Sequence, residues 1–141
     1  MTEQAGLDET KVHRLHALRV LIAGRDRRFL RVTSFLLSQR GYQVLETTSR
    51  STIRAVDRHR ADVVLLETND SRGVAGRMVA TLEALPAAPA VLLVVEDDDG
   101  ERWQGLSAIK KWTPIDALVQ EIETAAANRP TPLLDIERAY R

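Results

Sequence analysis

The sequence predicts an α/β fold built on a doubly wound parallel sheet of five strands, and three observations support this prediction. Apolar residues form runs at residues 18–23, interrupted only by Arg19, and at residues 63–66 and 90–95, as in strands that a sheet buries on both faces. Segments with helical spacing of apolar residues separate these runs. Strands that alternate with helices are typical of doubly wound sheets, whose functional groups lie at the carboxyl ends of the strands.

The individual elements follow from local patterns and from residues that stop them. In chain order they are a strand at residues 18–23, a helix at 27–40, a strand at 42–47, a helix at 51–60, a strand at 63–66, a helix at 72–85, a strand at 90–95, a weak strand at 106–109 and a helix at 114–127. Gly41 supplies the stop of the first helix. Pro86 and Pro89 prevent the third helix from continuing, and Pro114 suits the first turn of the last one.

The composition predicts one globular domain. The chain has 141 residues, of which 44% are hydrophobic and 28% charged, and we assign residues 18–128 to the domain. Residues 1–17 form an N-terminal extension and residues 129–141 a C-terminal tail. The absence of cysteine excludes disulfides and thiolate nucleophiles. We expect a cytoplasmic protein without membrane contact, because no apolar run could span a bilayer and the N-terminus lacks the apolar core of a signal peptide.

Four segments in a fixed order carry a resemblance to a known family: RVLIAGRDRRFLRVTSFLLSQRGYQV, ADVVLLE, AVLLVV and AIKKWTPIDAL. Through them, residues 18–127 resemble a response-regulator receiver domain, which implies the receiver or flavodoxin-like fold. The family phosphorylates itself. An acidic pair after its first strand holds magnesium, and an aspartate after its third strand accepts the phosphoryl group. A serine or threonine ends its fourth strand, and a lysine ends its fifth.

The resemblance indicates a degenerate phosphorylation site. It assigns to this site Gly24, Arg25 and, one place late, Asp26 after the first strand, Glu67 at the acceptor position, Val95 at the hydroxyl position and Lys111 at the lysine position. One carboxylate beside an arginine is a poor ligand set for magnesium. A glutamate is a methylene longer than aspartate, so its oxygens would be misplaced for in-line attack on a phosphoryl group. We therefore expect no phosphorylation, no catalysis, no metal and no cofactor.

The charges that remain at this site predict a permanent internal ion pair. We expect Arg25 and Lys111 both to approach the carboxylate of Glu67 and to hold one state without phosphate. The glutamate would also mimic the charged form, although it has one negative charge where a phosphate has nearly two. The alternative is a solvated Glu67 that has no such role.

The segment between the fourth and fifth strands also departs from the family. It is roughly six residues shorter than the receiver pattern, nearly two helical turns, so we expect the helix between these strands, the family's fourth, to be shortened or missing. Trp103 and Trp112 lie in this part of the chain. Tryptophan is favoured at binding hot spots, so both are interaction candidates, although each could instead fill vacated space. The sequence EDDDGE at residues 96–101 is interpreted as a solvated acidic loop.

A basic cluster begins the first helix, where Arg25 is followed by Arg27, Arg28 and Arg31. It is either a solvated face or a contact for an acidic partner. No helix-turn-helix signature follows, so direct binding of nucleic acid is not expected.

These observations predict an atypical receiver domain that acts as a protein–protein interaction module or adaptor in bacterial signal transduction. Its partner would be a signalling protein or an output domain, and a homodimer is plausible. Three alternatives stay open: residual phosphorylation on Asp26 or Asp70, a small ligand in the vestigial pocket, or a role as the input domain of a longer transcriptional regulator.

Overall fold

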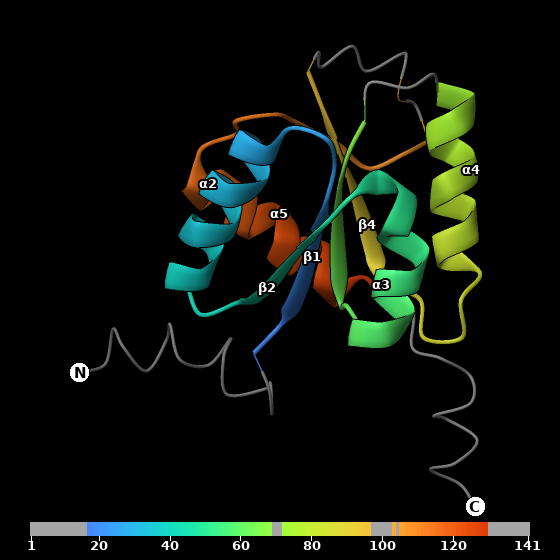
Figure 1. The fold of residues 1–141 in the computed structure, drawn as a ribbon, viewed down its shortest axis with the longest axis horizontal. Helices are drawn as coiled ribbons and strands as arrows, with labels where there is room; N and C mark the ends of the chain where they lie inside the picture. The colour runs from blue at the N-terminus through green and yellow to red at the C-terminus, as the bar shows by residue number, and fades with distance from the viewer. Residues whose placement is uncertain (1–16, 69–71, 97–102, 104, 130–141) are drawn as a thin grey trace, which may run out of the picture.

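The computed structural model describes residues 17–68, 72–96, 103 and 105–129. Within these ranges five strands form one parallel sheet in the order β2-β1-β3-β4-β5 (Figure 1). The strands are β1 (Arg19–Ala23), β2 (Gln43–Thr47), β3 (Val63–Glu67), β4 (Ala90–Val95) and β5 (Ala108–Lys110). The parallel five-stranded sheet with this strand order confirms the fold class predicted from the sequence.

Helices cover both faces of the sheet. They are α2 (Arg27–Gln39), α3 (Thr52–His59), α4 (Arg72–Glu83) and α5 (Ile115–Ala127), with a 3₁₀ turn at Ser49–Ser51. Helices α2 and α5 lie on one face, and α3 and α4 lie on the other (Figure 1). The three-layer arrangement explains why the sequences of the central strands are almost entirely apolar, since each strand is covered on both faces.

Two hydrophobic cores lie on the two sides of the sheet. On one side, Leu21, Val64 and Leu93 pack with residues of α3 and α4. On the other side, Ile22 and Leu65 pack with residues of α2 and α5. Successive residues of one strand therefore enter opposite cores, as the pleat of a β-strand requires.

The ends of α2 are fixed by local hydrogen bonds and by a glycine. The Asp26 side chain caps the helix, because its Oδ1 accepts hydrogen bonds from the backbone N–H groups of Arg28 and Phe29. At the other end Gly41 has a φ of 92°, a left-handed conformation that glycine adopts without steric cost. The stop predicted at Gly41 is thus confirmed.

The connection between β4 and β5 contains no helix in its described residues, which are Glu96, Trp103 and residues 105–107. This does not contradict the shortened or missing helix that the sequence predicts. Trp103 is only 5% exposed and packs in the core beside α3 and α4. Its carbonyl accepts a hydrogen bond from Leu106 N, and Gly105 has a φ of 85°. Because residues 105 and 106 belong to this turn, β5 begins at Ala108 and not at residue 106, where the sequence predicts it to begin.

Candidate functional site

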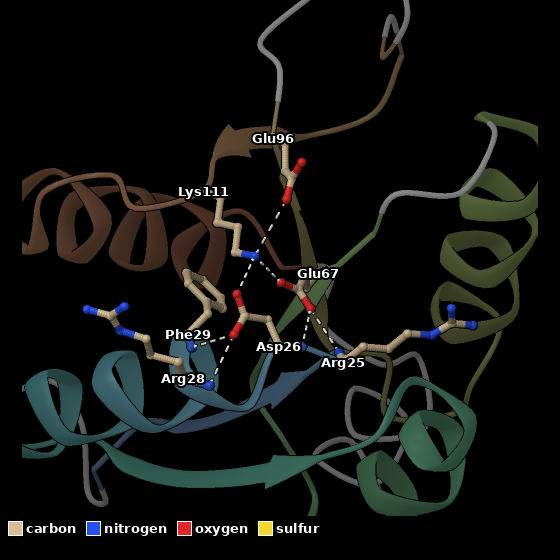
Figure 2. Close-up of polar contacts among 7 residues, drawn as sticks. All are labelled: Arg25, Asp26, Arg28, Phe29, Glu67, Glu96 and Lys111. Carbon is tan, nitrogen blue, oxygen red and sulfur yellow. Dashed lines mark hydrogen bonds and ion pairs between the residues drawn. The ribbon is translucent and has the colours of Figure 1, made fainter.

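The candidate site lies where the carboxyl ends of the central strands meet the start of α2 (Figure 2). Strands β1 and β3 are neighbours, with Ala23 opposite Leu66, so Gly24 and Glu67 come together just beyond them. Lys111 follows β5, and its backbone N–H donates to the carbonyl of Val95 at the end of β4. The structure therefore brings together Gly24, Asp26, Glu67, Val95 and Lys111.

The Glu67 carboxylate is buried, and both of its oxygens have partners. The residue is 8% exposed and ends a strand that is buried along its whole length. Its Oε1 accepts hydrogen bonds from the backbone N–H groups of Arg25, at 2.8 Å, and Asp26, at 3.0 Å. Its Oε2 lies 2.8 Å from the Lys111 ammonium nitrogen. The carboxylate is thus held by the amides that lead into α2 and by one cation.

Lys111 is surrounded by carboxylates (Figure 2). Its Nζ lies 2.7 Å from Asp26 Oδ2, 2.8 Å from Glu67 Oε2 and 3.7 Å from Glu96 Oε1, while its side chain is only 10% exposed. The pair with Glu96 is weaker, because that side chain is 64% exposed and water screens the attraction. The same ammonium lies 5.5 Å from the centre of the Phe29 ring, within range of a cation–π contact.

These contacts shift the pKa values of the three charged groups. Burial by itself raises the pKa of Glu67, but the hydrogen bonds from Lys111 and from the amides of Asp26 and Arg25 outweigh it and hold the pKa below its usual value. The hydrogen bond from Lys111, with those from the α2 amides, lowers the pKa of Asp26. Burial lowers the pKa of Lys111, but its two carboxylate partners outweigh this effect and raise the pKa well above the usual value. All three groups are therefore charged at neutral pH.

The stability of the protein should fall in acid, and Glu67 should account for part of that fall. Because the folded-state pKa of Glu67 lies below its usual 4.5, its contribution is fully present above pH 4.5 and is lost as the pH falls through the folded-state pKa. Urea denaturation of wild type and Glu67→Gln between about pH 7 and about pH 3 checks this expectation. The variant should be less stable at neutral pH and should lose less stability on acidification. Parallel pH profiles would contradict it.

Gly24 makes room for the Glu67 side chain. A Cβ atom at position 24 would lie 2.5 Å from Glu67 Oε1 and 2.7 Å from Glu67 Cβ. Real Cβ atoms do not approach other atoms this closely, so the glutamate conformation seen here requires glycine at position 24.

Replacing Gly24 with alanine should therefore displace the Glu67 carboxylate and destabilise the protein by about 1–3 kcal/mol. The measurement is chemical denaturation, with Gly76→Ala on α4 as the control. A Cβ at Gly76 would meet nothing within 4 Å. Equal effects of the two substitutions would show that Glu67 does not depend on the glycine.

The role predicted for Arg25 is wrong in one respect. Its guanidinium points away from Glu67, and its contribution is the backbone N–H (Figure 2). The second charged partner of the site is Asp26, which binds the same lysine and caps α2. An aspartate just before a helical pattern is a common N-cap, and that signal could have placed Asp26.

The Val95 side chain is apolar and buried, so it adds no polar group to the site. Val95 is 2% exposed and packs in the core on the α3 and α4 side of the sheet. Because valine has no hydroxyl group, the end of β4 offers no side-chain donor to an anion at this site.

The magnesium ion that the receiver fold implies does not fit the residues present. Gly24 has no ligating side chain, and the Arg25 side chain is a cation that points away (Figure 2). The carboxylates of Asp26 and Glu67 are already engaged by backbone amides and by Lys111. In the described part of the chain no group of three histidine or acidic residues could hold a metal ion. A magnesium ion would have to displace the lysine from both carboxylates.

The other residues singled out from the sequence contribute no side-chain hydrogen bond or ion pair to this site in the described part of the chain. Trp103 is in the core and offers no surface to a partner, whereas Trp112 is 51% exposed. Arg27, Arg28 and Arg31 are exposed on α2. Asp70, most of the acidic loop, residues 1–16 and residues 130–141 lie outside the described residues. None of the described helices has the length and apolar character needed to cross a membrane.

No protein-family model and no curated protein matches the sequence, but solved structures match its fold. The signal receiver domain of the response regulator NarL from Mycobacterium tuberculosis has a TM-score of 0.66 and 20% identity, covering 81% of this chain and 99% of that one. An atypical orphan response regulator with a phosphorylation-independent regulatory mechanism has a TM-score of 0.65 and 20% identity, covering 79% and 97%. A receiver domain of a modulated diguanylate cyclase from Desulfovibrio desulfuricans G20 has a TM-score of 0.63 and 21% identity, covering 80% and 96%. The chain therefore has the fold of the response-regulator receiver domains.

Proposed function

We propose that this chain is an atypical receiver domain that accepts no phosphate and acts through protein–protein contacts in bacterial signal transduction. The observation that carries the proposal is the closed set of contacts around Glu67. Its carboxylate accepts two backbone hydrogen bonds and pairs with Lys111. An internal anion thus occupies the donors that would otherwise bind an incoming phosphoryl group.

The chemistry of phosphoryl transfer supports the same proposal. The reaction depends on a correctly placed nucleophile and on cations that neutralise developing charge. Here the Lys111 ammonium is already neutralised by Asp26 and Glu67, and the acidic pair that would hold magnesium is replaced by Gly24 and Arg25. The module would thus have no enzymatic activity of its own, and we place it in the cytoplasm.

The proposal is tested by intact mass spectrometry after incubation with acetyl phosphate and magnesium. We expect no gain of a phosphoryl group, whereas a receiver domain with the complete acidic pair, treated in parallel, should gain one. A gain would contradict the proposal. Asp26→Asn and Asp70→Asn would then show which aspartate accepts the group. A loss of the gain in Asp70→Asn alone would identify Asp70, whereas a loss in Asp26→Asn would show that Asp26 is required, because this residue also pairs with Lys111.

A further inference from the structure

An open hollow lies beside the first two strands, at the amino ends where the chain enters the sheet. Arg19 of β1 and Gln43 of β2 are opposite each other at these ends, and both line the hollow. Its other wall is the end of α3 with the residues that follow, from Arg58 to Ala61. The candidate functional site is built at the carboxyl ends of the strands, so the two sites lie at opposite ends of the sheet (Figure 1).

The hollow has the size and the composition of a site for an organic ligand. Its volume is about 590 Å³, within the roughly 300–1,000 Å³ that is typical of ligand pockets. It offers an apolar surface, because the partly exposed Leu45 packs there against the core that contains Leu21 and Ala61. Gln43, which also lines it, is exposed and carries an amide that can both donate and accept hydrogen bonds.

The ionisable side chains that line the hollow are basic. They belong to Arg19, Arg58, His59 and Arg60, all four residues are exposed, and none of the ten lining residues is acidic. Within the described residues, no side chain of these four forms an ion pair or a hydrogen bond. Three guanidinium groups are therefore available to an anion, and their planar forks suit the oxygens of a phosphate group.

The two carboxylates nearest to these cations in the sequence do not offset their charge. One oxygen of Asp62 accepts a hydrogen bond from the Arg19 backbone N–H, and the other lies 2.6 Å from the Arg129 guanidinium. Asp57 lines a separate hollow, together with Leu85. The lining of the first hollow thus keeps an excess of positive charge, which attracts anions.

Arg60 occupies a position where glycine is the usual residue. It ends α3 in the left-handed conformation, with a φ of 52° and a ψ of 54°, and its backbone N–H donates to the carbonyl of Val56. This conformation is strained for an arginine and unstrained for a glycine. Strained residues are frequent at binding sites, where the surrounding structure holds them in place. A ligand for the guanidinium explains why a long cationic side chain stands where the backbone favours glycine.

We propose that this hollow is a nucleotide site, in which the phosphates bind the three guanidinium groups and the base lies over Leu45. Two observations favour a nucleotide over a simple anion. The hollow is much larger than a single phosphate group fills, and its apolar surface offers a contact to a flat base. This binding goes beyond the proposed function, because the hollow shares no residue with the contacts around Glu67.

The test is titration of the purified full chain with ATP, tripolyphosphate and adenosine, without magnesium, followed by calorimetry. We expect ATP to bind most tightly. Tripolyphosphate should bind about tenfold more weakly, because it buries no base, and adenosine should not bind measurably, because it carries no charge. The affinity for ATP should fall as salt is added, since the arginines are exposed. Equal affinities for ATP and tripolyphosphate, or tight binding of adenosine, would overturn the assignment of a nucleotide.

Arg60→Gly separates binding from stability. Glycine relieves the left-handed backbone, so the variant should be at least as stable as wild type in urea denaturation, whereas its affinity for ATP should fall about tenfold with the loss of a charged donor. Arg19→Ala should weaken binding similarly, because the backbone bond to Asp62 remains. The matched control is Arg54→Ala, an exposed arginine of α3 that lines the separate hollow with Asp57. Unchanged affinity in Arg60→Gly, or a loss in Arg54→Ala, would contradict the proposal.

Amide chemical shifts in NMR spectra of the full chain locate the nucleotide. Addition of ATP should shift the signals of Gln43, Leu45 and Ala61 and leave those of Glu67 and Lys111 in place. No shifts at all, or shifts concentrated at Glu67 and Lys111, would overturn the proposal. The mass experiment with acetyl phosphate is independent of this result, since a phosphoryl gain would refute the proposed function and leave the nucleotide site standing.

Discussion

Replacing Lys111 with methionine is expected to lower the free energy of unfolding by roughly 3 kcal/mol, because the substitution leaves the buried Glu67 carboxylate without its cation. Both side chains are largely removed from water, with exposed fractions of 10% for Lys111 and 7% for Glu67. The two backbone hydrogen bonds to Oε1 remain, which keeps the expected loss at the lower end for a broken buried ion pair. Methionine preserves most of the apolar stem, so the change isolates the ammonium group.

The measurement is urea denaturation at neutral pH, with Lys110→Met as the matched control. Lys110 is the preceding residue and is exposed, so its replacement should change stability by less than about 0.5 kcal/mol. A double variant, Lys111→Met with Glu67→Gln, should recover part of the loss, because it removes the uncompensated charge. Equal stability of Lys111→Met and wild type would show that the ion pair contributes nothing and that Glu67 is only a relic.

Replacing Trp103 with alanine should cost about 3–5 kcal/mol, as for other large aromatic residues truncated in a core. The indole is 5% exposed and packs in the same core as Leu93 and Val95. It fills space on the sheet beside a connection that has no helix in its described residues. Trp103→Phe should cost less, because it leaves a smaller cavity.

Thermal and chemical denaturation check this expectation, with Trp112→Ala as the comparison. Trp112 is about half exposed, so its removal should destabilise the protein far less. If Trp103→Ala were as stable as wild type, the indole would not be part of the core, and its possible role as a contact residue would have to be reconsidered.

The fold was predictable from the sequence because strands that are buried on both faces consist almost entirely of apolar residues. The runs in β1, β3 and β4 contain almost no polar residue, and each is followed by a segment with helical spacing or by a clear stop. The pairing of Glu67 with Lys111 was also predictable, since both follow strands of the same sheet. In a parallel sheet the carboxyl ends lie at one edge, which brings such residues together.

The contacts within the site depend on the directions of side chains and backbone N–H groups, which a sequence does not specify. A sequence shows that Arg25 is a cation, but not that its side chain points to solvent while its N–H points to the carboxylate. Asp26 has two roles at once, as a helix cap and as a partner of Lys111, whereas the sequence comparison placed it in the site only as a carboxylate one position too late for the acidic pair. Both tryptophans were candidates for partner contacts in the sequence. Only the packing of the segments before and after β5 decides that Trp103 is buried and Trp112 is exposed.

The close approach of Gly24 and Glu67 limits which substitutions the two positions can accept independently. A side chain at position 24 and the present glutamate at position 67 exclude each other, since the first Cβ would lie 2.5 Å from Oε1. An acidic residue could occupy position 24 only if the glutamate at position 67 were shortened or displaced. A substitution that shortens or displaces the glutamate alone loses contacts of its carboxylate with the backbone amides and with Lys111. The two positions are therefore coupled, so that a side chain at position 24 requires a simultaneous change at position 67.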